Sequence, residues 1–179
     1  IYMMEKAFGY VSTITLVELS NINTPLLKKL SETCAGTFQH SLQVSILASA
    51  ASAKIGADTQ LVRTGALYHD IGKMKNPPFF TENQMKGINP HRDLPFEQSA
   101  QIIISHVTEG IKMAEKAGLP EAIIDFIRTH HGAGKAKYFY NSYCNAHPGE
   151  PVDESLFTYP GPNPFTRETA ILMMADSVE

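Results

Sequence analysis

Residues 65–75 read Gly-Ala-Leu-Tyr-His-Asp-Ile-Gly-Lys-Met-Lys, which places His69 directly before Asp70. The residues before this pair carry apolar side chains at helical spacing, and Asp58 is of a type that caps helix N-termini. The stretch therefore predicts a helix that starts after Asp58 and delivers an imidazole and a carboxylate at its end.

The other candidate ligands share one property: each lies within or at the end of another segment with helical periodicity. They are His40, His106, His130, His131 and Asp176. Their segments cover residues 37–55, 96–117 and 121–131, and a last helix that Thr166 can cap. Ligands presented from several helices can converge in the core of a helical bundle.

The predicted fold class is all-α. A weakly amphipathic helix is expected over residues 3–19, and Thr24-Pro25 is a favourable helix start. No segment shows the alternation typical of a strand, so we expect a helical bundle. Two proline-rich stretches, residues 76–95 and 134–165, are expected to form long irregular excursions.

Composition limits the class of protein further. The chain has 179 residues, which fits a single domain over 1–179, and 43% of them are hydrophobic, enough for a packed core. Its net charge of −3 does not favour binding to a nucleic-acid polymer. There is no apolar run long enough to span a membrane, and the two cysteines do not indicate a disulfide framework. Because the chain starts at Ile1 and stops at Glu179 within an apparent helix, we expect a piece excised from a longer protein.

The candidate ligands suit a metal site by type as well as by position. Imidazoles and carboxylates together bind divalent iron, manganese, zinc and related ions. Each residue alone also has an ordinary structural explanation, such as a favourable charge at a helix end. The ordered set, with members on separate helices, favours a two-metal site. His91 and His147 lie in the excursions and are left out of it, and Cys34 and Cys144 are expected to be inert.

At these residues the sequence resembles a known superfamily. His40, the His69-Asp70 pair and Asp176 match the H…HD…D signature of HD phosphohydrolases. Further stretches resemble the C-terminal HD domain of the seven-transmembrane-receptor-type proteins, the PgpH-type cyclic di-AMP phosphodiesterases. These stretches are residues 36–44, 82–84, 103–107, 126–132, 159–162, 168–173 and 175–179. One departure is Ala35, where the family usually has proline.

The resemblance implies an HD domain that hydrolyses cyclic di-AMP to linear pApA with two divalent ions, most commonly Mn or Fe. It implies a bacterial membrane protein whose HD domain faces the cytoplasm, and a homodimer is compatible with it. By position, one metal would be held by His40, His69, Asp70 and Asp176. The other would be held by Asp70, His106, His130 and His131, with Asp70 bridging.

In the expected mechanism, a hydroxide bridging two metals about 3.5–4 Å apart attacks phosphorus in line with the leaving 3′-oxygen. Asp70 and Lys73 are the predicted catalytic residues. On a continuing helical turn Lys73 would face the phosphate and stabilise transition-state charge. A solvated lysine at a helix end is the alternative, since Gly72 could break the helix.

Three alternative functions stay open. A cyclic di-GMP phosphodiesterase would carry a GYP element after the paired histidines, where this chain has Gly-Ala-Gly-Lys at 132–135. A mixed-valent di-iron oxygenase would use a similar ligand set, and a non-catalytic nucleotide sensor would bind without turnover. Aromatic residues of the excursions are candidates for stacking on adenine: Phe79, Phe80, Tyr138, Tyr140 and Tyr143.

Overall fold

The computed structural model describes residues 11–179 and confirms the all-α prediction. Its α-helices are α2 (Thr13–Leu19), α3 (Pro25–Thr33), α4 (Ala35–Ile55), α5 (Thr59–Tyr68), α6 (Phe96–Lys116), α7 (Glu121–Thr129), α8 (Lys137–Ala146) and α9 (Arg167–Val178). Short 3-10 helices are η1 (Ile71–Lys75), η2 (Pro77–Phe79), η3 (Thr81–Asn83) and η4 (Glu154–Phe157). Within residues 11–179, β pairing is limited to an isolated bridge between Lys135 and Thr158.

Two of the predicted helix starts, at Asp58 and Thr166, are confirmed by side-chain capping interactions, whereas Thr24 makes no side-chain capping hydrogen bond. The side chain of Asp58 accepts a hydrogen bond from the Leu61 backbone N–H at 2.9 Å, which fixes the start of α5. Thr166 and Thr169 form a reciprocal capping box at the start of α9. α3 begins at Pro25, as predicted. Of the helix expected over residues 3–19, positions 3–10 lie outside the described residues.

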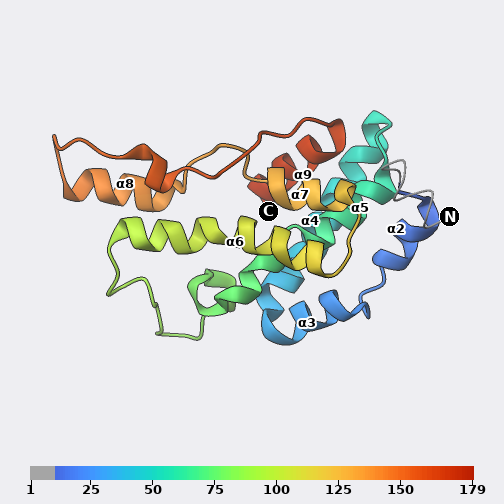
Figure 1. Ribbon diagram of the computed structural model, residues 1–179, viewed down its shortest axis with the longest axis horizontal. Coiled ribbons are helices and arrows are strands. Elements are labelled where there is room, and N and C mark those ends of the chain that lie inside the picture. The colour runs from blue at the N-terminus through green and yellow to red at the C-terminus, as the bar shows by residue number, and fades with distance from the viewer. Residues whose placement is uncertain (1–10) are drawn as a thin grey trace.

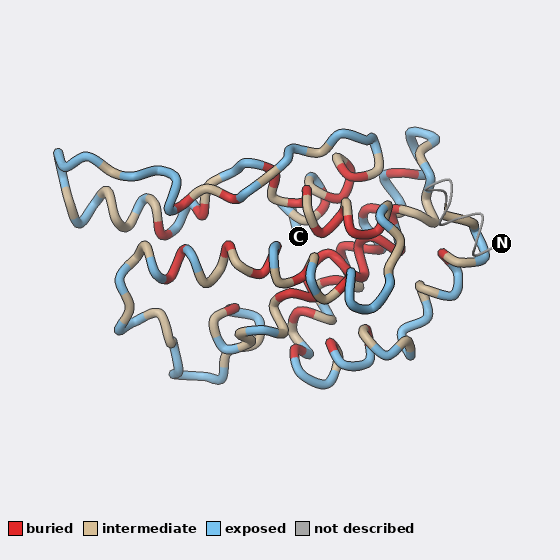
Figure 2. The backbone as a smooth tube through the Cα atoms, in the orientation of Figure 1, coloured by how far each residue is buried: buried red, intermediate tan, exposed pale blue. Residues whose placement is uncertain are grey.

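Helix α5 lies at the centre of the bundle, between two hydrophobic clusters (Figure 1). Leu67 and Tyr68 enter the cluster shared with α3 and α7, whereas Val62 and Ala66 enter the one shared with α4 and α9. Figure 2 shows the buried residues concentrated where α4, α5 and α7 cross. The end of α5, which carries the predicted ligands, is therefore held from two sides.

An elongated arm, formed by α6, α8 and η4, extends away from this centre (Figure 1). A third cluster fills it, with Ile104 and Val107 of α6 packed against Phe139 and Phe157. The expectation of an irregular stretch over 134–165 was therefore wrong at α8, because the aromatic side chains of that segment bury one helical face against α6.

The other excursion, residues 76–95, consists of turns with two short 3-10 helices, as expected of an ordered loop. His91 Nε2 lies 2.9 Å from the Phe79 carbonyl oxygen, and the His91 ring packs against the phenyl ring of Phe79. His147 stacks on Tyr143 in the arm. Neither histidine belongs to a ligand cluster among the described residues.

Candidate metal centre

The first ligand group joins three helices at the base of α5. It consists of His40, His69, Asp70 and Asp176, and one ligand atom from each lies within 4.8 Å of all the others. The Asp176 Oδ1 atom is 2.9 Å from His40 Nε2 and 3.3 Å from His69 Nε2. His69 Nε2 is also 3.3 Å from Asp70 Oδ2. The four side chains predicted to hold one metal thus converge.

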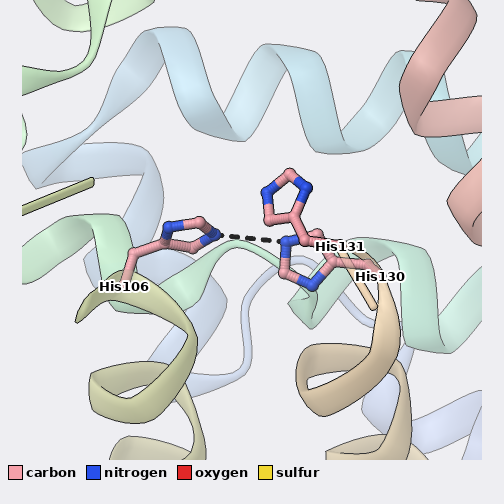
Figure 3. Close-up of side chains that lie close together, drawn as sticks. All are labelled: His106, His130 and His131. Atoms are coloured by element: carbon pink, nitrogen blue, oxygen red, sulfur yellow. Dashed lines mark hydrogen bonds between the residues drawn. The ribbon is translucent and has the colours of Figure 1, made fainter. Parts of the chain in front are cut away.

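The second ligand group consists of His106 on α6 and the pair His130 and His131 just after α7 (Figure 3). The Nε2 atoms of His106 and His130 are 3.2 Å apart. Asp70 Oδ1 is 3.3 Å from the first of these atoms and 3.5 Å from the second. Asp70 therefore faces the first ligand group with Oδ2 and the second with Oδ1, which is the arrangement that a bridging carboxylate requires.

Backbone carbonyls orient three of the rings. In His69, His106 and His130 alike, Nδ1 faces the carbonyl oxygen three residues earlier in the same chain. A carbonyl oxygen only accepts, so Nδ1 carries the proton and donates it. Nε2 is thereby directed toward the other ligands, as in metal sites whose histidines are fixed from behind.

These residues fit divalent cations. With both Nδ1 atoms protonated, neutral His106 and His130 direct lone pairs at each other, and the hydrogen bond drawn in Figure 3 needs an additional proton on one ring. Asp70 Oδ1 is buried and makes no hydrogen bond among the described residues. Buried acceptors that face one another are unfavourable unless a cation lies between them. Imidazole and carboxylate donors suit such a cation.

The charges of the carboxylates follow from their neighbours. Burial opposes ionisation of Asp70, but the adjacent Lys73 and His69 hold the pKa of Asp70 well below its usual range. Burial likewise opposes ionisation of Asp176, and the hydrogen bond from His40 together with the adjacent His69 ring lowers the pKa of Asp176 strongly. Both carboxylates are therefore anionic at neutral pH.

The histidines differ in charge. Burial and the nearby His130 lower the pKa of His131 to about 2, so its ring is neutral, as a ligand must be. Burial opposes protonation of His69, yet the carboxylates Asp70 and Asp176 raise the pKa of His69 to about 10. A metal in the first group would replace the extra proton of His69, so binding would release protons.

Lys73 reaches the same centre by a different turn than predicted. After Asp70 the chain continues as the 3-10 helix η1, and Lys73 Nζ lies 2.7 Å from Asp70 Oδ2 and 2.9 Å from Glu82 Oε1. Burial opposes its charge, but the two carboxylates raise the pKa of Lys73. The side chain is therefore an ammonium directed at the shared carboxylate.

A close backbone contact between η1 and α6 sets the distance between the ligand groups. A Cβ on Gly72 would lie 1.8 Å from the His106 carbonyl oxygen and 2.5 Å from the Gly110 nitrogen. Glycine thus lets Asp70, two residues earlier, approach the His106 ring.

Sequence reasoning assigned no role to three residues at the centre. Glu82 contacts Lys73, and the Tyr159 ring stacks on His131 at 4.2 Å between centroids. The Glu179 side-chain carboxylate forms a hydrogen bond with His40 Nδ1. All three come from stretches that resemble the family, and this was their only signal. Glu82 lies in the short 3-10 helix η3, Tyr159 in a loop and Glu179 at the end of α9, and helical periodicity predicts the position of none of them.

The aromatic residues proposed to stack on adenine differ in their surroundings and in their exposure. Tyr140 and Tyr143 pack against Phe157 in the arm. Phe80 is buried with its edge toward His106, at 5.7 Å between centroids, whereas Tyr138 is 74% exposed.

The fold and the ligand set define the class. Residues 37–179 match the family described as HD domain, and the chain belongs to that family.

Within it, the chain is 47% identical over 177 residues to the cyclic-di-AMP phosphodiesterase PgpH of Listeria monocytogenes serotype 1/2a (strain 10403S). It is 45% identical over 175 residues to the protein of that name from Bacillus subtilis (strain 168). The matches cover 99% and 98% of this chain, but the chain spans only 24% of the length of each relative.

A solved structure supports the same relationship. The crystal structure of the L. monocytogenes PgpH HD domain in complex with cyclic-di-AMP superposes with a TM-score of 0.83 at 47% identity. The match covers 88% of this chain and 73% of that one. In the part of the chain that the structure describes, none of the helices is both long and apolar enough to cross a membrane.

Proposed function

We propose that this domain is a metal-dependent phosphodiesterase that hydrolyses cyclic di-AMP to linear pApA. The observation that carries the proposal is the placement of Asp70 between two ligand groups, one oxygen facing each. The similarity to an HD domain solved with cyclic-di-AMP supports the choice of substrate.

Two divalent ions, with Mn or Fe as the proposed metals, would be held by the two groups sharing Asp70. Bound there, they would stabilise the negative charge of the phosphate and would lower the pKa of a metal-bound water to near neutrality. The protein's own contribution is orientation: the carbonyls behind His69, His106 and His130 fix each ring before any metal binds.

Lys73 has the second proposed catalytic role. Its ammonium is ionised and directed at Asp70, which places a positive charge beside the ligands that would face the phosphate. Fixed charges of this kind stabilise the charge that develops in a phosphoryl transition state. We propose that Lys73 acts in this way and that it transfers no proton.

We also propose that the domain is part of a membrane-anchored protein and faces the cytoplasm. The support is its similarity to PgpH proteins, of which it spans about a quarter. Fractionation of the full-length protein, with protease protection of this domain in sealed vesicles, tests the proposal.

The activity is tested by incubating the purified domain, loaded with Mn or Fe under reducing conditions, with cyclic di-AMP and in parallel with cyclic di-GMP. Chromatography follows the products. We expect conversion of cyclic di-AMP to pApA with little turnover of the other nucleotide. A protein with both metals bound that cleaves neither nucleotide would contradict the proposal, and oxygen consumption by the iron form would indicate an oxygenase.

A further inference from the structure

Glu82 lies beside the centre but outside both ligand groups. Its Oε1 atom is 2.9 Å from Lys73 Nζ and accepts a hydrogen bond from the Thr37 hydroxyl at 2.9 Å. The Asn83 amide donates to the same hydroxyl at 2.7 Å, and the Thr37 backbone N–H donates to the Asn83 side-chain oxygen. Thr37 is fully buried, so the hydrogen bonds of Glu82 and Asn83 attach this partly exposed loop to a fixed point of the protein interior.

The backbone around this cluster is tightly packed as well. A Cβ on Gly36 would lie 2.0 Å from the Glu82 carbonyl oxygen, so η3 rests directly on the first turn of α4. His40, a candidate ligand, follows one turn later on α4. The position of Glu82 is therefore set by the same helix that presents a ligand to the centre.

The same loop contacts Lys73 a second time. Phe80 places its ring 5.1 Å from Lys73 Nζ, measured to the centroid. Asp70, Glu82 and Phe80 thus surround the ammonium with two anions and an aromatic ring. Because a lysine side chain has several freely rotating bonds, such a set of contacts is needed to hold its charge at one point.

We propose that Glu82 is a positioning residue, which holds the ammonium of Lys73 against the shared carboxylate Asp70. This inference rests on the proposed function and deepens it. Asp70 divides its charge among Lys73 and the imidazoles of both groups, whereas Glu82 contacts no candidate ligand that the structure records. The charge of Glu82 consequently acts on Lys73, and it does so whether or not Asp70 also binds a metal ion.

A double-mutant cycle tests this action through Lys73. The variants are Glu82→Gln, which keeps the size of the side chain but removes the charge, Lys73→Met and their combination. Glu109→Gln is the matched control, because Glu109 also binds a lysine at 2.7 Å, but this lysine, Lys112 of α6, is 68% exposed and contacts neither ligand group, whereas Lys73 is 14% exposed. Turnover of cyclic di-AMP, metal content and the thermal midpoint of the metal-free protein are measured for each.

We expect Glu82→Gln to lower kcat about tenfold and to change KM less than about twofold, with metal content intact. In the Lys73→Met background, the same change should lower kcat less than about twofold, because the residue it positions is gone. The midpoint of the metal-free protein should fall by about 3 °C with Lys73 present and by less than about 1 °C without it. Glu109→Gln should match the wild type in all three measurements.

Losses that multiply in the double variant would overturn the proposal, because Glu82 would then act independently of Lys73. A wild-type protein that cleaves nothing would overturn the proposed function instead, and the thermal cycle alone would then decide whether Glu82 holds Lys73. If Glu82→Gln does not fold, Thr37→Val removes the hydroxyl that holds Glu82, and the cycle is repeated with it.

Discussion

Replacing Gly72 with alanine should damage the centre more than it destabilises the fold. The new Cβ would meet three backbone atoms of α6, at 1.8 Å, 2.5 Å and 2.8 Å, and backbone cannot rotate away as a side chain can. The segment η1 must then retreat from α6 by about 1 Å, a displacement that can cost an enzyme about 100-fold in rate. Asp70 moves with it, away from His106, whose Nε2 is now 3.3 Å from Asp70 Oδ1.

Overpacking of this kind costs about 1–3 kcal/mol, which corresponds to a fall of about 3–10 °C in Tm for a domain of this size. Circular dichroism gives Tm, and the chromatographic assay gives kcat. Gly110→Ala is the milder comparison at the same contact, since its Cβ would meet a methyl group of Ile127 at 2.9 Å, which can move, and the Gly72 backbone only at 3.3 Å and beyond. A Gly72→Ala protein with wild-type Tm and turnover would show that the contact between η1 and α6 does not require glycine.

Other predictions concern single side chains. Asp70→Ala should lose metal and activity together, since Asp70 faces both ligand groups; elemental analysis beside the activity assay checks this, and an active variant with full metal content would contradict a bridging role. Lys73→Met should lower turnover at least about tenfold while metal content is retained, and unchanged turnover would remove Lys73 from the mechanism. Cys34 should react with a thiol reagent at pH 8 at least about tenfold more slowly than the half-buried Cys144, because burial shields Cys34 and raises the pKa of its thiol; equal rates would contradict the packing.

The helices that carry ligands could largely be predicted from the sequence. Periodicity and capping residues locate α4, α5, α6, α7 and α9, because both signals depend only on residues that are close together in the sequence. Helix α8 was not predicted, because the prolines that follow it in the sequence indicate an irregular segment. Its Phe139, Tyr140 and Tyr143 follow helical spacing and were the available signal.

The geometry of the centre could not be predicted in the same way. His40 and Asp176 are 136 positions apart, and no local rule brings their side chains within 2.9 Å. Their grouping was implied by the family resemblance, and the structure places them together. Glu82 was assigned no role because its position depends on the packing of a loop against α4, which no periodic pattern encodes.

The ring orientations of His106 and His130 have a consequence for the energy landscape of the domain. Without a cation, the two Nε2 acceptor atoms face each other and form a local conflict in the interior. Natural sequences tolerate such frustration mainly where function requires it. Metal binding would remove the conflict only in the folded chain, since the ligands are dispersed once it unfolds. The unfolding equilibrium would then respond to the free metal concentration, and resistance to unfolding would become a measure of how fully the centre is loaded.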